Sequence, residues 1–164
     1  MNFTDEELEN RSKDIDSTTD SGAYLRYKYY PLLPDKVGER FPLADATKKS
    51  ILDPLPNGDG DGDENSDDRT EYLKGLFQSI ATEVERKGYE VLRDLGASPP
   101  FPTQIMTAGG GSKNGVWTSL RQRIINESID SKAGTVEVTQ AKNSEASYGA
   151  ALLAAAGFKS YKFS

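Results

Sequence analysis

The residues best suited to chemistry lie in one short stretch, Thr103 to Asn114, which reads TQIMTAGGGSKN. Its apolar residues predict a strand over Gln104–Thr107, and an amphipathic helix pattern begins after Asn114. Between them, Gly109, Gly110 and Gly111 would let a ligand approach the backbone because no Cβ intervenes. The N-terminus of the following helix offers unpaired N–H groups and a positive dipole end. This arrangement is typical of a nucleotide site, and it also fits a tight turn that binds nothing.

Asn114 has two interpretations of its own. Its amide can donate to and accept from a nucleotide, and it is also a good N-cap for the next helix. Both roles use the same side chain, so the sequence leaves them as alternatives. The stretch has neither the Gly-Lys-Ser/Thr ending of a P-loop nor the spaced glycines of a dinucleotide fingerprint.

Composition excludes several classes of function. The chain of 164 residues has no cysteine and no histidine, which excludes disulfides, zinc sites and Ser/His or Cys/His nucleophiles within it. A net charge of -6 argues against nucleic acid or an anionic membrane as a partner. The hydrophobic fraction of 35% predicts one domain with a small core.

The first residues of this sequence do not predict a targeting signal. They read MNFTDEELENRSKDID, without an apolar signal core, and no apolar run in the chain has membrane length. A plastid-targeting start would be rich in Arg and Ser and poor in acids, unlike this one. We expect a soluble chain, cytoplasmic or plastid, and leave its compartment unassigned.

Two regions precede the main helical pattern. Thr4 and Glu7 have capping-box spacing at the start of a helix predicted over Phe3–Asn10. From Tyr24 to Asp45, aromatic residues and prolines occur without helical or strand period. We interpret this segment as an ordered loop that packs on another surface, because the net negative charge disfavours stacking on single-stranded nucleic acid.

The stretch Asn57 to Asp68, NGDGDGDENSDD, has the composition of a solvated acidic linker. A calcium loop is the alternative, because its ligand positions are matched in part, by Asn57, Asp59, Asp61, Gly62 and Asp68. The first ligand is Asn where Asp is usual, and the last is Asp where a bidentate Glu is usual. Prolines also replace the entering helix, so we favour the linker.

The strongest helix is predicted over Arg69–Leu95, where apolar residues recur at helical spacing. Asp68 and Glu71 have the spacing of its capping box, and Gly96 followed by prolines ends it. Gly88 lies on the apolar stripe, where it would admit a neighbouring backbone or bend the helix.

The sequence after the glycine turn predicts a further helix. In this helix, one apolar face is formed by Val116, Trp117, Leu120, Ile124 and Ile125. We interpret Arg121 and Arg123, which lie beside or opposite this face, as solvated.

A second strand is predicted over Thr135–Thr139, and a last helix of small residues over Ser144–Gly157. Core packing accounts for the shared face of that helix, formed by Tyr148, Ala151, Leu152 and Ala155. The order from residue 69 is therefore helix, strand, helix, strand, helix, and the fold class is α/β.

Two blocks of this sequence resemble the C-terminal domain of the FGGY carbohydrate kinases. The first is the glycine turn with Asn114, Trp117 and Arg121 to Arg123, and the second is SEASYGAALLAAAGF, Ser144 to Phe158. Within the family the likeness is greatest to the plant and cyanobacterial ribulose- or xylulose-kinase-like group. That group also carries a segment like YYPL…GERFPLAD, Tyr29 to Asp45 here.

The resemblance implies an actin-like ATPase fold, in which two ribonuclease-H-like domains close over a cleft, with ATP on the C-terminal domain and sugar on the N-terminal one. This chain would be part of the C-terminal domain, an α/β partial ribonuclease-H-like unit with an irregular N-terminal extension. We divide it into an insertion segment (1–56), an acidic linker (57–68) and the nucleotide-binding part (69–164). The family's three antiparallel strands have no match here, and two strands alone predict marginal folding.

The resemblance also implies a function, the ATP-binding portion of a ketose kinase that transfers the γ-phosphate to a sugar hydroxyl. Its nucleotide contacts would be Gly109, Gly110, Gly111 and Asn114. The family's catalytic aspartate belongs to the N-terminal half, so we assign no catalytic residue and no metal ligand in this chain. The expected partners are ATP or ADP, a small sugar and the N-terminal kinase half, which would hold most of the magnesium site.

The chain alone would then not be catalytically competent. The alternatives are a stand-alone, non-catalytic nucleotide-binding remnant and a calcium-responsive acidic protein.

Overall fold

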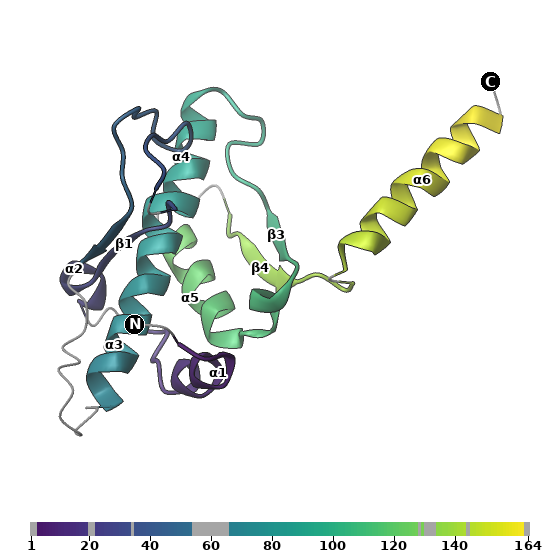
Figure 1. Ribbon diagram of the computed structural model, residues 1–164. Helices are drawn as coiled ribbons and strands as arrows, with labels where there is room; N and C mark the ends of the chain where they lie inside the picture. The colour runs from purple at the N-terminus through teal and green to yellow at the C-terminus, as the bar shows by residue number, and fades with distance from the viewer. Residues whose placement is uncertain are drawn as a thin grey trace.

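The computed structural model describes residues 3–19, 22–33, 35–53, 66–127, 129, 134–143 and 145–162. Its longest element is a continuous helical rod, drawn teal in Figure 1. The rod consists of α3 (Ser66–Ser79), a π-helical segment η1 (Ile80–Arg86) and α4 (Lys87–Asp94). The predicted helix over Arg69–Leu95 is therefore present, and every other element except α6 is arranged around it.

The rod ends as the sequence predicts but begins differently. Gly96 has a φ of 88°, and its N–H donates to the Arg93 carbonyl over 2.9 Å while the Ala97 N–H donates to the Leu92 carbonyl over 3.0 Å. This pair of bonds is a Schellman motif, which only a residue that accepts positive φ closes easily. The predicted capping box at Asp68 is wrong, because the helix already begins at Ser66. Asp68 instead accepts a hydrogen bond from the Tyr27 hydroxyl and pairs with Arg26.

The N-terminal helix α1 (Asp5–Lys13) has the predicted capping box. The Glu7 N–H donates to Thr4 Oγ1 over 3.1 Å, and the Thr4 N–H donates to Glu7 Oε2 over 3.3 Å. The helix runs past Asn10 to Lys13 and packs against α3. Arg69 of the rod holds it there through a 2.9 Å contact with Glu7.

The aromatic segment from Tyr24 to Asp45 packs on the rod, as predicted. Two of its tyrosines, Tyr27 and Tyr30, are 1% and 3% exposed. The prediction that it lacks regular structure is wrong, because a short helix and a short strand lie at its start. These are α2 (Ala23–Arg26) and β1 (Lys28–Tyr30), which pairs antiparallel with β2 (Ile51–Asp53). Strands of three residues are too short to give a recognisable alternation.

Gly88 lies against a side chain of this same segment. A Cβ on Gly88 would lie 3.1 Å from the Phe41 ring, so the glycine makes room for an aromatic ring where the sequence predicted a backbone or a bend. Downstream of η1 the predicted apolar stripe leaves the core, since Leu92 and Leu95 are 42% and 78% exposed. A π-helical turn bonds i to i+5 and is wider than an α-turn, which changes the angular phase of the residues that follow.

A second sheet supports the glycine turn. It consists of β3 (Gln104–Thr107) and β4 (Glu137–Gln140), which are parallel with Ile105 opposite Val138. The bounds of β3 are those predicted, whereas β4 begins two residues later than the predicted Thr135. The crossover helix α5 (Gly115–Asn126) joins the strands and contacts both β4 and the rod.

The core is small and lies on both sides of α5. Toward the rod it comprises Ala81, Leu120 and Ile124, with Phe77 and Trp117 packed against them. Toward the sheet it comprises Ile125, Val136 and Val138, with partly buried neighbours Tyr89, Phe101, Ile105 and Ile129. Four of the five residues predicted for the apolar face of α5 thus belong to the core, namely Trp117, Leu120, Ile124 and Ile125.

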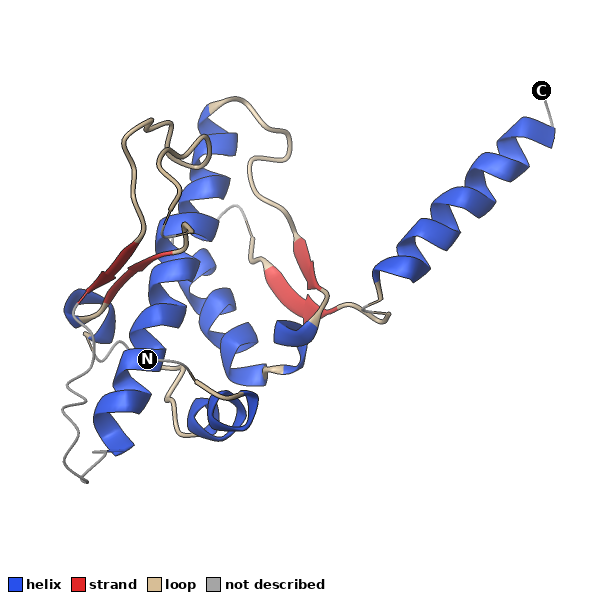
Figure 2. Cartoon of the chain, in the orientation of Figure 1, coloured by secondary structure: helices blue, strands red, loops and turns tan. Residues whose placement is uncertain are grey.

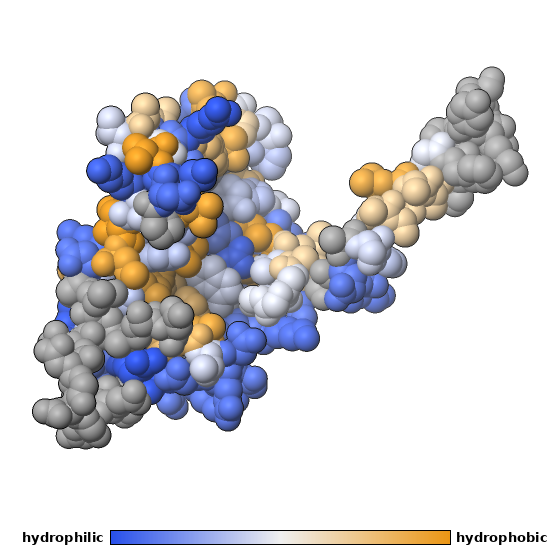
Figure 3. Space-filling view, viewed as in Figure 1, coloured by the Kyte–Doolittle hydropathy of each residue, from blue (hydrophilic) through white to orange (hydrophobic). Residues whose placement is uncertain are grey.

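The last helix, α6 (Ala146–Lys162), extends away from the rest of the chain (Figures 1 and 2). It does not end at Gly157 as predicted, because that glycine keeps a negative φ and the helix continues. The prediction that its apolar face packs in the core is wrong. Tyr148, Leu152 and Leu153 are 48%, 54% and 77% exposed, and Figure 3 shows apolar residues on the surface of this helix.

The order helix, strand, helix, strand, helix from residue 69 is confirmed, and the chain is a mixed α/β protein. Most of the acidic stretch Asn57 to Asp68, with the candidate calcium positions except Asp68, lies outside the described residues. Within the described ranges, no helix is both long and apolar enough to cross a membrane.

Candidate functional site

The glycine turn begins at the carboxyl end of β3. Gly109 follows Thr107 and Ala108, and a 3-10 turn over Gly110–Lys113 then leads to α5. The N–H and the hydroxyl of Ser112 both donate to the Gly109 carbonyl, over 3.1 and 2.7 Å. Ser112 is only 4% exposed, so its side chain fastens the turn from inside.

The conformation of Gly109 explains why a glycine is needed there. Its φ is 85° and its ψ is -173°. Only glycine adopts this region without strain, and other residues incur about 1–3 kcal/mol. The turn is therefore held in one shape by Gly109 at its start and by Ser112 in its middle.

The outer side of the turn is open backbone. All three glycines are exposed, and no atom lies within 4 Å of the position that a Cβ would take at Gly109 or Gly110. At Gly111 the nearest atom would be Cδ1 of Trp117, at 4.0 Å. A nucleotide could therefore lie directly against this backbone, and the three positions fit the contact that the sequence predicts for them.

Asn114 occupies the N-cap position of α5. Its Oδ1 accepts a hydrogen bond from the Trp117 N–H over 3.0 Å, and its backbone is extended, with φ -86° and ψ 102°. One of the two roles predicted for this residue is thus present in the structure. The capping bond uses the carbonyl oxygen of the amide, so the Nδ2 group can donate to a ligand without breaking it.

Trp117 backs the turn. Its ring packs on Phe77 of the rod, with ring centroids 5.2 Å apart and an angle of 47° between the planes. The guanidinium of Arg121 lies 5.2 Å from the centre of the same ring. The third glycine of the turn therefore rests on an aromatic ring that two other side chains hold in place.

The interpretation of Arg121 as a solvated residue is wrong. The residue is 7% exposed, its Nε donates to Glu85 Oε2 over 2.7 Å, and its Nη1 donates to Thr107 Oγ1 over 2.6 Å. The signal in the sequence is the spacing of Trp117, Arg121 and Ile125, each four residues apart and so on one helix face. Arg123 is not fully solvated either: its side chain is 23% exposed, and it donates to the Ser17 carbonyl and to Glu127.

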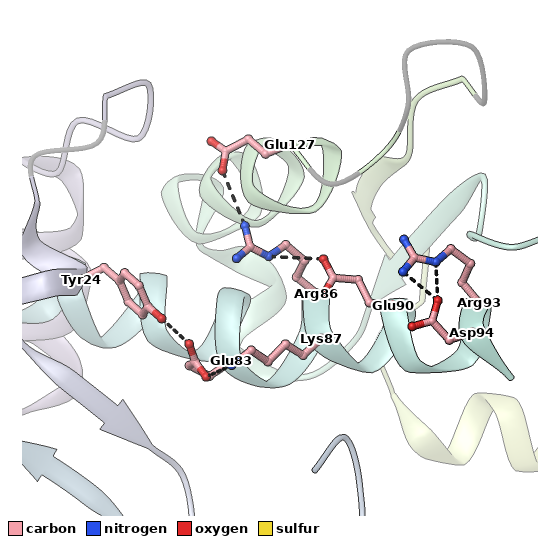
Figure 4. Close-up of polar contacts among 8 residues, drawn as sticks. All are labelled: Tyr24, Glu83, Arg86, Lys87, Glu90, Arg93, Asp94 and Glu127. Atoms are coloured by element: carbon pink, nitrogen blue, oxygen red, sulfur yellow. Dashed lines mark hydrogen bonds and ion pairs between the residues drawn. The ribbon is translucent and has the colours of Figure 1, made fainter.

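Among the described residues, the carboxyl groups whose pKa departs from the ordinary value all shift downward: Glu7, Asp16, Asp45 and Glu83. Asp16 falls to a pKa of about 2, chiefly because Thr18 donates a hydrogen bond to it. For Glu83, burial raises the pKa, but hydrogen bonds from Lys87 and Tyr24 outweigh it and lower the pKa (Figure 4). A general base at neutral pH benefits from a raised carboxyl pKa, so these groups lack that property.

No group of three Asp, Glu, His or Cys side chains in the described part of the chain is placed to hold a metal ion. Asp68, the last candidate calcium position, is engaged by Tyr27 and Arg26. The part of the site that the structure describes thus consists of open glycine backbone, the start of α5 and an asparagine amide. These groups suit binding of a nucleotide more than acid–base chemistry.

Comparison with protein families identifies the family of the chain. The family described as the FGGY family of carbohydrate kinases, C-terminal domain, matches residues 3–158. The match begins before α1, includes the rod and the glycine turn, and ends within α6. Because it covers nearly the whole chain, the protein belongs to the FGGY family of carbohydrate kinases, in which it matches the C-terminal domain.

Proposed function

We propose that this chain is the ATP-binding C-terminal portion of a kinase that transfers the γ-phosphate of ATP to a hydroxyl of a ketose such as ribulose or xylulose. The observation that carries the proposal is the open glycine turn between β3 and α5. It offers bare backbone and a capped helix N-terminus at one place in a carbohydrate kinase domain.

In this proposal the chain binds and orients the nucleotide. Backbone at Gly109, Gly110 and Gly111 lies against it, and Asn114 Nδ2 donates to it while Oδ1 keeps its capping bond. Magnesium, when bound with ATP, neutralises charge on the phosphates. The acceptor sugar, the catalytic base and most of the metal site belong to the N-terminal half of the kinase.

The ketose is proposed from the sequence segment Tyr29 to Asp45, which resembles the ribulose- or xylulose-kinase-like group. That segment packs on the rod and does not line the glycine turn, so it supports the grouping of the enzyme and not a sugar contact. Joined to its N-terminal half, the protein should phosphorylate a ketose in preference to an aldose of the same length, as a coupled ADP-release assay would show.

The nucleotide site is tested by Gly110→Val. Gly110 has a negative φ and nothing near its Cβ position, so the variant should fold normally while its side chain occupies the ligand's place. We expect ADP affinity, measured by calorimetry, to fall at least about tenfold, which is about 1.4 kcal/mol. Gly149→Val, at another exposed glycine with open surroundings, is the matched control. If Gly110→Val and Gly149→Val bind ADP equally well, the glycine turn is not the nucleotide site.

A second candidate is a nucleotide-binding module without catalysis. It is favoured by the two core clusters, which give the chain a buried interior of its own. It predicts that the purified chain unfolds cooperatively and binds ADP but transfers no phosphate. Non-cooperative unfolding would count against it.

A further inference from the structure

The polar contacts of Arg121 connect the glycine turn to the rest of the fold. The residue lies two turns into α5, between the rod and the end of β3. Its guanidinium makes a forked contact with Glu85 from the π-helical segment, and its Nη1 bonds the hydroxyl of Thr107. One side chain thus joins three elements.

Thr107 and Arg121 bracket the turn. Thr107 is the last residue of β3, and the 14-residue separation between it and Arg121 contains the whole glycine turn and the N-cap. The 2.6 Å bond between them closes this stretch into a loop of fixed span. Ser112 fastens the turn internally, and the Thr107–Arg121 bond fastens its two ends to each other.

The ion pair between Arg121 and Glu85, which orients the guanidinium toward Thr107, is largely buried. The side chains of Arg121 and Glu85 are only 8% and 16% exposed, so the ion pair is poorly screened by water. Because Nε and Nη2 of Arg121 both donate to the carboxylate of Glu85, the plane of the guanidinium is fixed. The remaining nitrogen, Nη1, then points at Thr107. The hydroxyl therefore meets a donor whose orientation is already set by the rod.

We propose that Arg121 is a positioning residue for the nucleotide site, which through Thr107 and Glu85 holds the glycine turn in the shape that receives the nucleotide. The inference rests on the proposed function. A turn that is already ordered in the free protein loses little conformational entropy when the nucleotide binds. The contact of Arg121 with Glu85 and Thr107 therefore raises nucleotide affinity without touching the nucleotide.

Thr107 is the site at which to test this, because its hydroxyl can be removed without unpairing the buried charges. Thr107→Val keeps the β-branched shape and loses the oxygen, and Thr107→Ser keeps the oxygen. Thr139→Val, in the paired strand β4, is the matched control. Two quantities are measured on the full chain: amide hydrogen exchange over residues 109–113 without ligand, and ADP affinity by calorimetry.

We expect faster exchange and about tenfold weaker ADP binding in Thr107→Val. Thr107→Ser and Thr139→Val should stay close to wild type in both measurements. Rescue by serine separates a role of the hydroxyl from a general effect on folding. Arg121→Lys, which keeps the charge but loses the fork, should resemble Thr107→Val.

Unchanged exchange in Thr107→Val would overturn the inference, and so would faster exchange with unchanged ADP affinity. In both cases ADP binding by the wild-type chain leaves the proposed function standing. A wild-type chain that binds no ADP overturns the nucleotide site itself, and the positioning role with it.

Discussion

The backbone of Gly75 is in direct contact with Tyr27. A Cβ on Gly75 would lie 2.7 Å from the Cβ of Tyr27 and 2.9 Å from the carbonyl oxygen of Ala23. Helices α2 and α3 can approach this closely only because residue 75 has no side chain. Tyr27 is thereby buried, and its hydroxyl reaches Asp68 near the start of α3.

Gly75→Ala should therefore destabilise the protein, although alanine is the better helix former. Overpacking of this kind costs about 1–3 kcal/mol, and the nearest atoms here are backbone and Cβ atoms that cannot rotate away. The free energy of unfolding in urea is the measurement. Gly149→Ala, at an exposed helical glycine with open surroundings, should show no loss. Equal stability of the two variants would contradict the close packing of α2 on α3.

Substitutions at Asn114 should separate its two roles. The capping bond to the Trp117 N–H needs only a side-chain oxygen, so Asn114→Asp should retain the stability that this bond provides. The same substitution should weaken ADP binding, since it removes the Nδ2 donor and adds negative charge beside the nucleotide. Asn114→Ala should lose both, with a stability cost of about 0.5–2 kcal/mol.

Thermal unfolding and calorimetry, made on the same samples, measure these effects. If Asn114→Asp binds ADP as wild type does, the amide is a cap and nothing more. If Asn114→Ala is as stable as wild type, the capping bond contributes nothing.

Alkaline pH should destabilise the fold through two tyrosines. Burial, reinforced by hydrogen bonds to Glu83 and Asp68, raises the pKa of Tyr24 and of Tyr27 from 10.0 to about 12. The folded state thus favours the neutral phenols. Their contribution to stability is complete below pH 10 and is lost as pH rises from about 10 through about 12.

Urea unfolding between about pH 8 and about pH 12 would reveal this as a falling midpoint above about pH 10. Tyr24→Phe and Tyr27→Phe should each reduce that slope, and Figure 4 shows the Tyr24 contact that the first of them removes. Tyr148→Phe, on the exposed face of α6, is the control. A slope that both substitutions leave unchanged would place the alkaline transition elsewhere.

The features predicted correctly are those set by neighbouring residues. The capping box of Thr4 and Glu7, the end of the rod at Gly96 and the strand Gln104–Thr107 each depend on a few adjacent positions. Their backbone geometry follows from local hydrogen bonds and from the φ that glycine permits. Such signals can be recognised from a short window of sequence.

The features missed depend on partners far along the chain. Arg121 is buried because Glu85, 36 residues away, meets it, and no local pattern in the sequence names that partner. The strands β1 and β2 pair across more than twenty residues and are three residues long, so neither alternates long enough to be seen. The shared face of α6 predicts core packing, but a helical face by itself does not identify a partner, and here it is exposed.

The candidate site divides in the same way. Its glycines and Asn114 could be identified from a short stretch of sequence, together with the two possible roles of the asparagine. The geometry of the capping bond, and the contact of Arg121 with Glu85 and Thr107, could be seen only in the structure. The nucleotide contacts themselves remain a prediction.

The position of Trp117 has an optical consequence. It is the chain's one tryptophan, its ring lies beside Gly111, and Phe77 and Arg121 hold it there. Light that excites indole selectively therefore reports on the surroundings of this one ring, where the glycine turn, α5 and the rod meet. The intrinsic fluorescence of the unlabelled protein should therefore change when the region around the glycine turn unfolds in denaturant and when a ligand binds there.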